Sequence, residues 1–190
     1  VYQLAEGAGK IRGTKNGGVE QTPTWANTII TTGETPMTNS GSGAGAINRV
    51  IEIECKTSEK IIEDGHKVSS AVKKNYGFAG KEFVEKLYSG NNVEKACKLY
   101  VEYFKKLTDG DTTDKQAMAA AAILVADKYA TEWIFMDNYS LTIEDISKFL
   151  ASKIAVSAGE RGYRYMLDWT AQNSNKLRPD NEGEVYGVIE

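Results

Sequence analysis

The chain has 190 residues, of which 41% are hydrophobic and 26% are charged, and its formal net charge is −3. This balance excludes both a wholly disordered chain and a polycation that coats nucleic acid by charge alone. The length suffices for one domain of ordinary size with a buried core.

Glycine and charge are distributed unevenly along the chain. Residues 1–50 hold nine of the 18 glycines, with four basic and three acidic residues, whereas residues 111–190 hold eight basic and 13 acidic residues. We therefore expect a glycine-rich first part over residues 1–56 and an acidic second part within residues 57–190.

The first part predicts a short helix, two strands and the loops between them. A helix should end near Ala5, because Gly7–Gly18 carries five glycines. The β-branched segment Thr24–Thr32 predicts a buried strand, and Val50–Cys55 alternates apolar and acidic residues as a half-exposed strand does. The glycine-rich segment Pro36–Ala46 between them predicts a long loop.

From Ser58 onward the apolar residues recur with the period of a helix. They predict helices over residues 61–72, 79–88, 93–107, about 114–135, 141–150 and 162–173. Residue pairs typical of helix starts support three of these helices: Thr113 with Gln116, Thr142 with Asp145, and Ser157 with Glu160. A last apolar stretch, Val185–Ile189, predicts one arm of a terminal hairpin.

The sequence contains only weak indications of a metal site, a disulfide or a membrane helix. Neither Cys55 nor Cys97 has a second cysteine or a histidine at ligand spacing, which favours a reduced, cytoplasmic protein without a metal site. His66 is the only histidine, so a catalytic triad is not expected. The longest apolar stretch, Ala117–Ala126, is about half of what a membrane helix needs, so no membrane partner is expected.

The glycine segments invite a phosphate-binding interpretation, which their sequences do not support. Gly7–Lys10 is followed by Ile11 where a P-loop needs Ser or Thr, and Gly41–Gly45 contains no lysine. A different signal is the acid-free loop that carries Lys10, Arg12 and Lys15. Such a cluster suits contacts with a phosphate backbone, although a solvated turn is the alternative.

Several short segments resemble one family, the domain-of-unknown-function 927 family of phage- and mobile-element-associated, helicase-like P-loop proteins. The resemblance rests on Gly9-Lys10 with Arg12-Gly13, Thr24-Trp25, Thr31-Thr-Gly-Glu34, Arg49-Val-Ile-Glu-Ile53, Thr131-Glu-Trp-Ile-Phe135 and Gly159-Glu-Arg-Gly-Tyr163. It covers nearly the whole chain and is strongest over residues 1–55. It implies a mainly α chain with a small β part: the C-terminal remnant of a RecA- or AAA+-like α/β ATPase core, followed by a helical domain.

The resemblance also implies roles for individual residues. Thr31 and Thr32 would hold the sensor position near the γ-phosphate, and Arg49 would act as an arginine finger across a subunit interface. Lys10, Arg12 and Lys15 would lie on a loop that faces nucleic acid. ATP and Mg²⁺ would be bound by the remainder of the parent ATPase, because the chain contains neither a P-loop nor the acidic Mg²⁺-binding motif.

The leading hypothesis is therefore the C-terminal portion of a phage or mobile-element ATPase with a DNA helicase or translocase role. The chain alone is expected to hydrolyse no ATP. Its expected partner is the remainder of the parent ATPase, DNA is a possible second partner, and the parent is expected to assemble as a homo-oligomer. The alternative is a helical adaptor or oligomerisation module of a replication-associated protein, which the acidic balance of residues 111–190 favours for that half.

Overall fold

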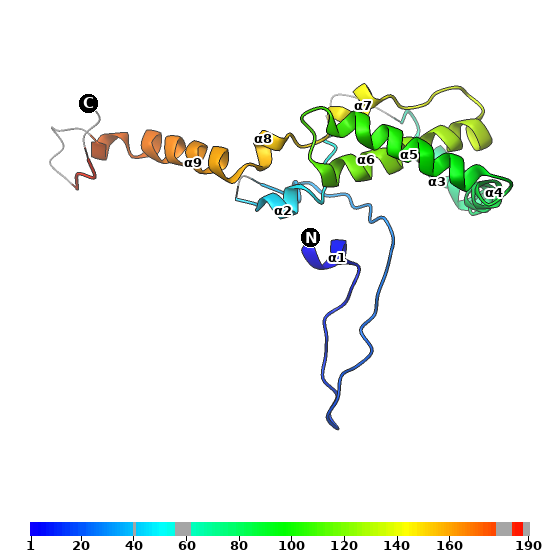
Figure 1. Ribbon diagram of the computed structural model, residues 1–190, viewed down its shortest axis with the longest axis horizontal. Coiled ribbons are helices and arrows are strands. Elements are labelled where there is room, and N and C mark those ends of the chain that lie inside the picture. The colour runs from blue at the N-terminus through cyan, green and yellow to red at the C-terminus, as the bar shows by residue number, and fades with distance from the viewer. Residues whose placement is uncertain (40, 56–61, 178–183, 188–190) are drawn as a thin grey trace.

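The computed structural model describes residues 1–39, 41–55, 62–177 and 184–187, and within these ranges the chain forms helices and no β-strand (Figure 1). The expectation of a mainly α protein is confirmed. In chain order the helices are α1 (Tyr2–Glu6), α2 (Ala44–Ile47), α3 (Gly65–Lys74), α4 (Phe78–Leu87), α5 (Asn92–Thr108), α6 (Asp114–Ala130), the π-helix η1 (Thr131–Phe135), α7 (Ile143–Ser147), α8 (Lys153–Val156), α9 (Ala158–Gln172) and the 3₁₀-helix η2 (Ser174–Leu177). None of the described helices combines the length and hydropathy needed to cross a bilayer.

The core lies where α5 packs along α6 (Figure 1). Ala117, Ala120 and Ala121 of α6 are completely buried, because their small side chains let the two helix backbones approach closely. The same cluster includes Leu107 of α5 and Ile146 of α7. The alanine-rich run of the sequence therefore serves as a packing surface.

A second, aromatic cluster extends the core beyond the C-terminal end of α6. The rings of Tyr129 and Trp133 stack with their centroids 4.4 Å apart, and Phe83 of α4 lies 5.5 Å from Trp133. Trp133 belongs to η1, which continues α6 directly and ends at Met136, a residue with a left-handed φ of 54°. The predicted helix end near Phe135 is confirmed, but the sequence did not indicate the change to π-helical geometry.

The N-terminal part forms a two-limbed arm that extends away from the helices (Figure 1). Its limbs are joined by backbone hydrogen bonds of 2.8 Å from Gly9 to Pro23, from Trp25 to Gly7 and from Glu20 to Arg12, which make only isolated bridges. We call residues 7–25 the basic arm.

The strand predicted over Thr24–Thr32 is wrong. This segment has no neighbouring strand, and the side chain of Ile30 is 90% exposed. A β-branched sequence forms a strand only when another backbone pairs along it, and in the described chain the pairing stops at the isolated bridge of Thr24 with Ala8 and the hydrogen bond from Trp25 to Gly7. The small β part that we expected is therefore not formed.

The strand predicted over Val50–Cys55 is also absent, because no other backbone segment of the described residues pairs with it. Its first residue is bound to helix α6 instead. The carbonyl oxygens of Ile47 and Val50 accept hydrogen bonds of 2.8 and 2.9 Å from the side-chain amide of Gln116. Gln116 also accepts a 2.5 Å hydrogen bond from the backbone N–H of Ala151, so one buried amide joins three segments. The predicted capping box of Thr113 with Gln116 is wrong, because the amide points away from the helix start.

The predicted cap residues of α7 and α9 are confirmed. Thr142 and Asp145 form a capping box at α7, and the Ser157 hydroxyl accepts the Glu160 N–H at α9, which begins four residues earlier than expected. Helix α3 begins at Gly65 because the Asp64 side chain caps it. The predicted start of this helix at Ile61 lies outside the described residues, as does the end of the Val185–Ile189 segment, whose described residues 185–187 are not a strand.

Candidate functional site

The basic arm places the three predicted nucleic-acid contacts on an exposed hairpin. Its turn is closed by a 3.0 Å hydrogen bond from the Thr14 N–H to the Gly18 carbonyl. Gly17 and Gly18 have φ values of 78° and 123°, which glycine adopts without strain. Lys10, Arg12 and Lys15 are all exposed on this hairpin, so their charges are available to a partner.

The two predicted sensor threonines lie on the limb that returns from the arm. Thr31 and Thr32 are exposed and lie outside any helix or strand. Among the described residues, no hydrogen bond or ion pair connects either threonine with Arg49. The structure therefore shows no bond that joins the predicted arginine finger to the predicted sensor residues.

Arg49 connects the first two helices. Its Nη1 donates a 2.8 Å hydrogen bond to the carbonyl of Gly45, and its guanidinium lies 5.1 Å from the centroid of the Tyr2 ring. Gly45 allows this approach, because a Cβ atom at that position would lie 2.8 Å from the Tyr2 hydroxyl. In this chain Arg49 is half-buried and fixes α1 against α2.

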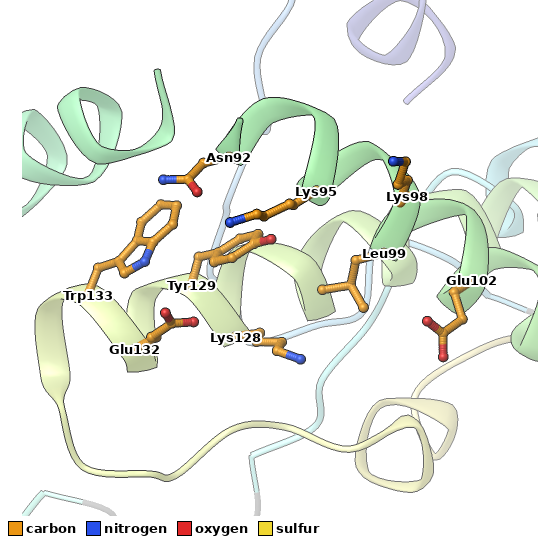
Figure 2. Close-up of a pocket in the computed structure, with 9 residues that line it drawn as sticks. All are labelled: Asn92, Lys95, Lys98, Leu99, Glu102, Lys128, Tyr129, Glu132 and Trp133. Atoms are coloured by element: carbon orange, nitrogen blue, oxygen red, sulfur yellow. The ribbon is translucent and has the colours of Figure 1, made fainter. Parts of the chain in front are cut away.

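A groove that we did not predict from the sequence runs between α5 and the end of α6 (Figure 2). Its volume is about 490 Å³. It is lined by residues of α5, α6 and η1: Asn92, Lys95, Lys98, Leu99, Glu102, Lys128, Tyr129, Glu132 and Trp133. We call this feature the α5–η1 groove.

The charges around the α5–η1 groove are only partly paired. Lys98 is bound to Glu94 at 2.7 Å, and Glu102 to Lys106 at 2.7 Å, a hydrogen bond that lowers the pKa of the Glu102 carboxyl. Three further charged side chains make no ion pair with any described residue: Lys95, Lys128 and Glu132. Figure 2 shows the Lys95 ammonium extending over Tyr129 toward Trp133.

The floor of the groove is aromatic and carries two unused polar groups. Tyr129 and Trp133 are each only 8% exposed, and burial raises the pKa of the Tyr129 hydroxyl, with a further contribution from Glu132. Neither the Tyr129 hydroxyl nor the Trp133 indole N–H has a hydrogen-bond partner among the described residues. Both groups are therefore free to bind a ligand.

The sequence contained a signal for this groove. Lys95, Lys98 and Glu102 recur at helical spacing on α5, and so do Tyr129 and Trp133 on the α6–η1 segment. Each set by itself looks like an ordinary amphipathic helix. The groove becomes visible only when α5 and α6 are known to lie side by side.

Comparison with known proteins identifies no family for this chain. No protein-family model, curated protein or solved structure matches this chain. The roles that the family resemblance implies therefore stay predictions. Within the described ranges, no group of three or more His, Cys, Asp or Glu side chains could hold a metal ion.

Proposed function

We propose that this chain is part of a helicase-like, DNA-translocating ATPase and that the basic arm is its DNA-contacting element. The observation that carries the proposal is the exposure of Lys10, Arg12 and Lys15 on a hairpin that stands away from the helices. Cations on such a projection can reach phosphates without a clash between the helices and the duplex.

The segment Thr24–Thr32 supports a place within a larger core. It has the composition of a buried strand, yet Ile30 is exposed and, beyond Trp25, no backbone hydrogen bond of the described chain pairs with it. A sheet supplied by the remainder of the parent ATPase would satisfy both its apolar side chains and its free N–H and C=O groups.

In this proposal ATP and Mg²⁺ are bound by the remainder of the parent, which assembles as a homo-oligomer. Thr31 and Thr32 would lie beside the nucleotide, and Arg49 would leave Gly45 and Tyr2 to reach a neighbouring subunit. An Arg49→Ala change in the parent should reduce turnover by orders of magnitude and leave nucleotide binding nearly intact. Unchanged turnover would remove Arg49 from that role.

DNA binding by the chain itself tests the basic arm. We expect fluorescence anisotropy with labelled single- and double-stranded DNA to show binding that weakens as salt rises, because phosphate contacts release counterions. Charge reversal of Lys10, Arg12 and Lys15 to Glu should abolish this binding. Reversal of Lys67, Lys73 and Lys74 on α3 makes the same change in net charge and should leave most of it.

The DNA proposal fails if both triple variants lose binding equally, since net charge alone would then explain it. It also fails if the unmodified chain binds neither form of DNA.

An assembly role is the second candidate, and helix α9 favours it. This helix extends beyond the body and has no buried residue (Figure 1). Tyr163, Met166 and Leu167 lie within about one turn of one another, and each is more than half exposed. Sedimentation velocity should show concentration-dependent association that Met166→Glu with Leu167→Glu removes, and a chain that stays monomeric at all concentrations argues against self-assembly.

A further inference from the structure

The α5–η1 groove presents hydrogen-bond donors that nothing in the described chain uses. The Tyr129 hydroxyl and the Trp133 indole N–H belong to side chains that are more than nine-tenths buried, yet both groups lack a partner. Both polar atoms are nevertheless accessible from the groove, since the fully buried side-chain atoms without a partner among the described residues are those of Asn48 and Thr113. They can therefore donate to water or to a ligand in the groove. The Lys95 ammonium extends over the same floor (Figure 2).

The charges at the groove restrict the kind of ligand. Two unpaired ammonium groups, on Lys95 and Lys128, together with two neutral donors favour an anion. The carboxylates of Glu102 and Glu132 line the same groove and would repel a densely charged polyanion such as nucleic acid. A ligand with a single anionic group satisfies both conditions.

The shape of the floor indicates what accompanies the anionic group. Leu99 and the Tyr129 and Trp133 rings provide apolar contact, and these two rings stack on each other with their centroids 4.4 Å apart, so each has one face already occupied. Small-molecule sites typically combine such an apolar lining with a few polar groups that fix orientation.

We propose that the α5–η1 groove binds a small organic anion that has one carboxylate or phosphate group and an aromatic or apolar body. Lys95, the Tyr129 hydroxyl and the Trp133 indole N–H bind the anionic group, and Leu99 contacts the body. The site shares no residue with the basic arm, so anion binding and DNA binding can be tested separately.

The test uses the full chain labelled with ¹⁵N, titrated with benzoate, with phenyl phosphate and with neutral benzyl alcohol. The readout is the indole N–H signal of Trp133, assigned by its loss in Trp133→Phe. Trp25 and Trp169 provide internal controls, since the Trp25 indole donates to the Leu4 carbonyl and Trp169 stacks on Tyr186, both outside the groove. We expect a saturable shift of the Trp133 signal with at least one anion and none with benzyl alcohol.

Two matched variants separate binding from structure. Lys95→Gln should weaken the affinity for the anion at least about tenfold, and Tyr129→Phe should weaken it severalfold while keeping the ring in place. Lys81→Gln, on the exposed surface of α4, should leave the affinity unchanged. The tighter of the two anions identifies the group that the site prefers.

The proposal is overturned if neither anion produces a saturable shift, or if benzyl alcohol shifts Trp133 as strongly. It is also overturned if all three indole signals move together or if Lys95→Gln binds as the unmodified chain does. The triple variant of the basic arm should bind the anion normally, which keeps this result distinct from the DNA experiment.

Discussion

Gln116 shows how a single side chain can fix several segments. The residue is 2% exposed, and its side-chain amide makes three hydrogen bonds, two as donor and one as acceptor. We predict that Gln116→Leu lowers the free energy of unfolding by about 2–4 kcal/mol, because it leaves partly buried backbone groups of Ile47, Val50 and Ala151 without partners. Urea denaturation followed by circular dichroism measures this loss.

Thr113 is the matched control for this prediction. Its hydroxyl is buried near the start of the same helix but has no hydrogen-bond partner in the described chain. Thr113→Val keeps the shape and removes the unused hydroxyl, so its stability should equal or exceed that of the unmodified chain. A loss at Thr113→Val as large as that at Gln116→Leu would contradict the explanation.

The hydrogen bonds of Glu52 lead us to predict that the free energy of unfolding depends on pH. Thr38 donates its backbone N–H and its hydroxyl to the Glu52 carboxylate at 2.9 and 2.8 Å. The backbone hydrogen bond is the largest cause that lowers the pKa of Glu52 below its usual 4.5. A depressed folded-state pKa means that the carboxylate stabilises the fold above about pH 4.5 and that this contribution disappears as the pH falls through the folded-state pKa.

Glu52→Gln should therefore be less stable than the unmodified chain at pH 7 and equally stable once both are below that pKa. Urea denaturation at a series of pH values measures the difference. Glu54→Gln, at a neighbouring exposed position, should show no such convergence. A difference between Glu52→Gln and the unmodified chain that stays constant with pH would show that the hydrogen bonds from Thr38 do not depend on the charge.

At the scale of elements, α9 contains a glycine that no contact with the described residues explains. Gly162 lies within the helix, and a Cβ atom added there would meet nothing within 4 Å. Glycine is about 1 kcal/mol less favourable than alanine in a helix interior. We predict that Gly162→Ala increases the protection of α9 amides against hydrogen exchange and that Ala171→Gly decreases it.

The same substitution bears on assembly. If Gly162→Ala strengthens the helix but weakens association in sedimentation, the glycine serves close approach by another molecule. Unchanged protection in α9 would mean that its helicity does not limit exchange, contrary to the prediction.

The elements that the sequence predicted well have local causes. The Thr142–Asp145 capping box, the apolar period of α5 and the alanine-rich composition of α6 depend on residues within a few turns of one another, and the structure confirms the helices that they predict. The strand over Thr24–Thr32 failed because its stability requires a partner at a distance. The π-helix η1 and the α5–η1 groove depend on packing between helices, which the period of one helix does not reveal.

At the scale of the whole molecule, the chain is a helical body with two extensions (Figure 1). The basic arm leaves one side, and α9 leaves one end. Neither extension adds a residue to the buried clusters between α4 and α7. The exposure of Lys10, Arg12 and Lys15 was predictable from their charge, whereas the projection of the arm from the body was not.

The Gln116 hydrogen bonds also have a consequence for the order of folding. Helices α5 and α6 are neighbours in sequence, so their contact closes a short loop and should form early. The bond from Gln116 to the Ile47 carbonyl spans 69 residues and should form after the rate-limiting step. Stopped-flow measurements on the milder variant Gln116→Asn should then show faster unfolding with nearly unchanged refolding, the signature of a contact absent from the transition state. The N-terminal segment would thus attach to a helical body that has already folded.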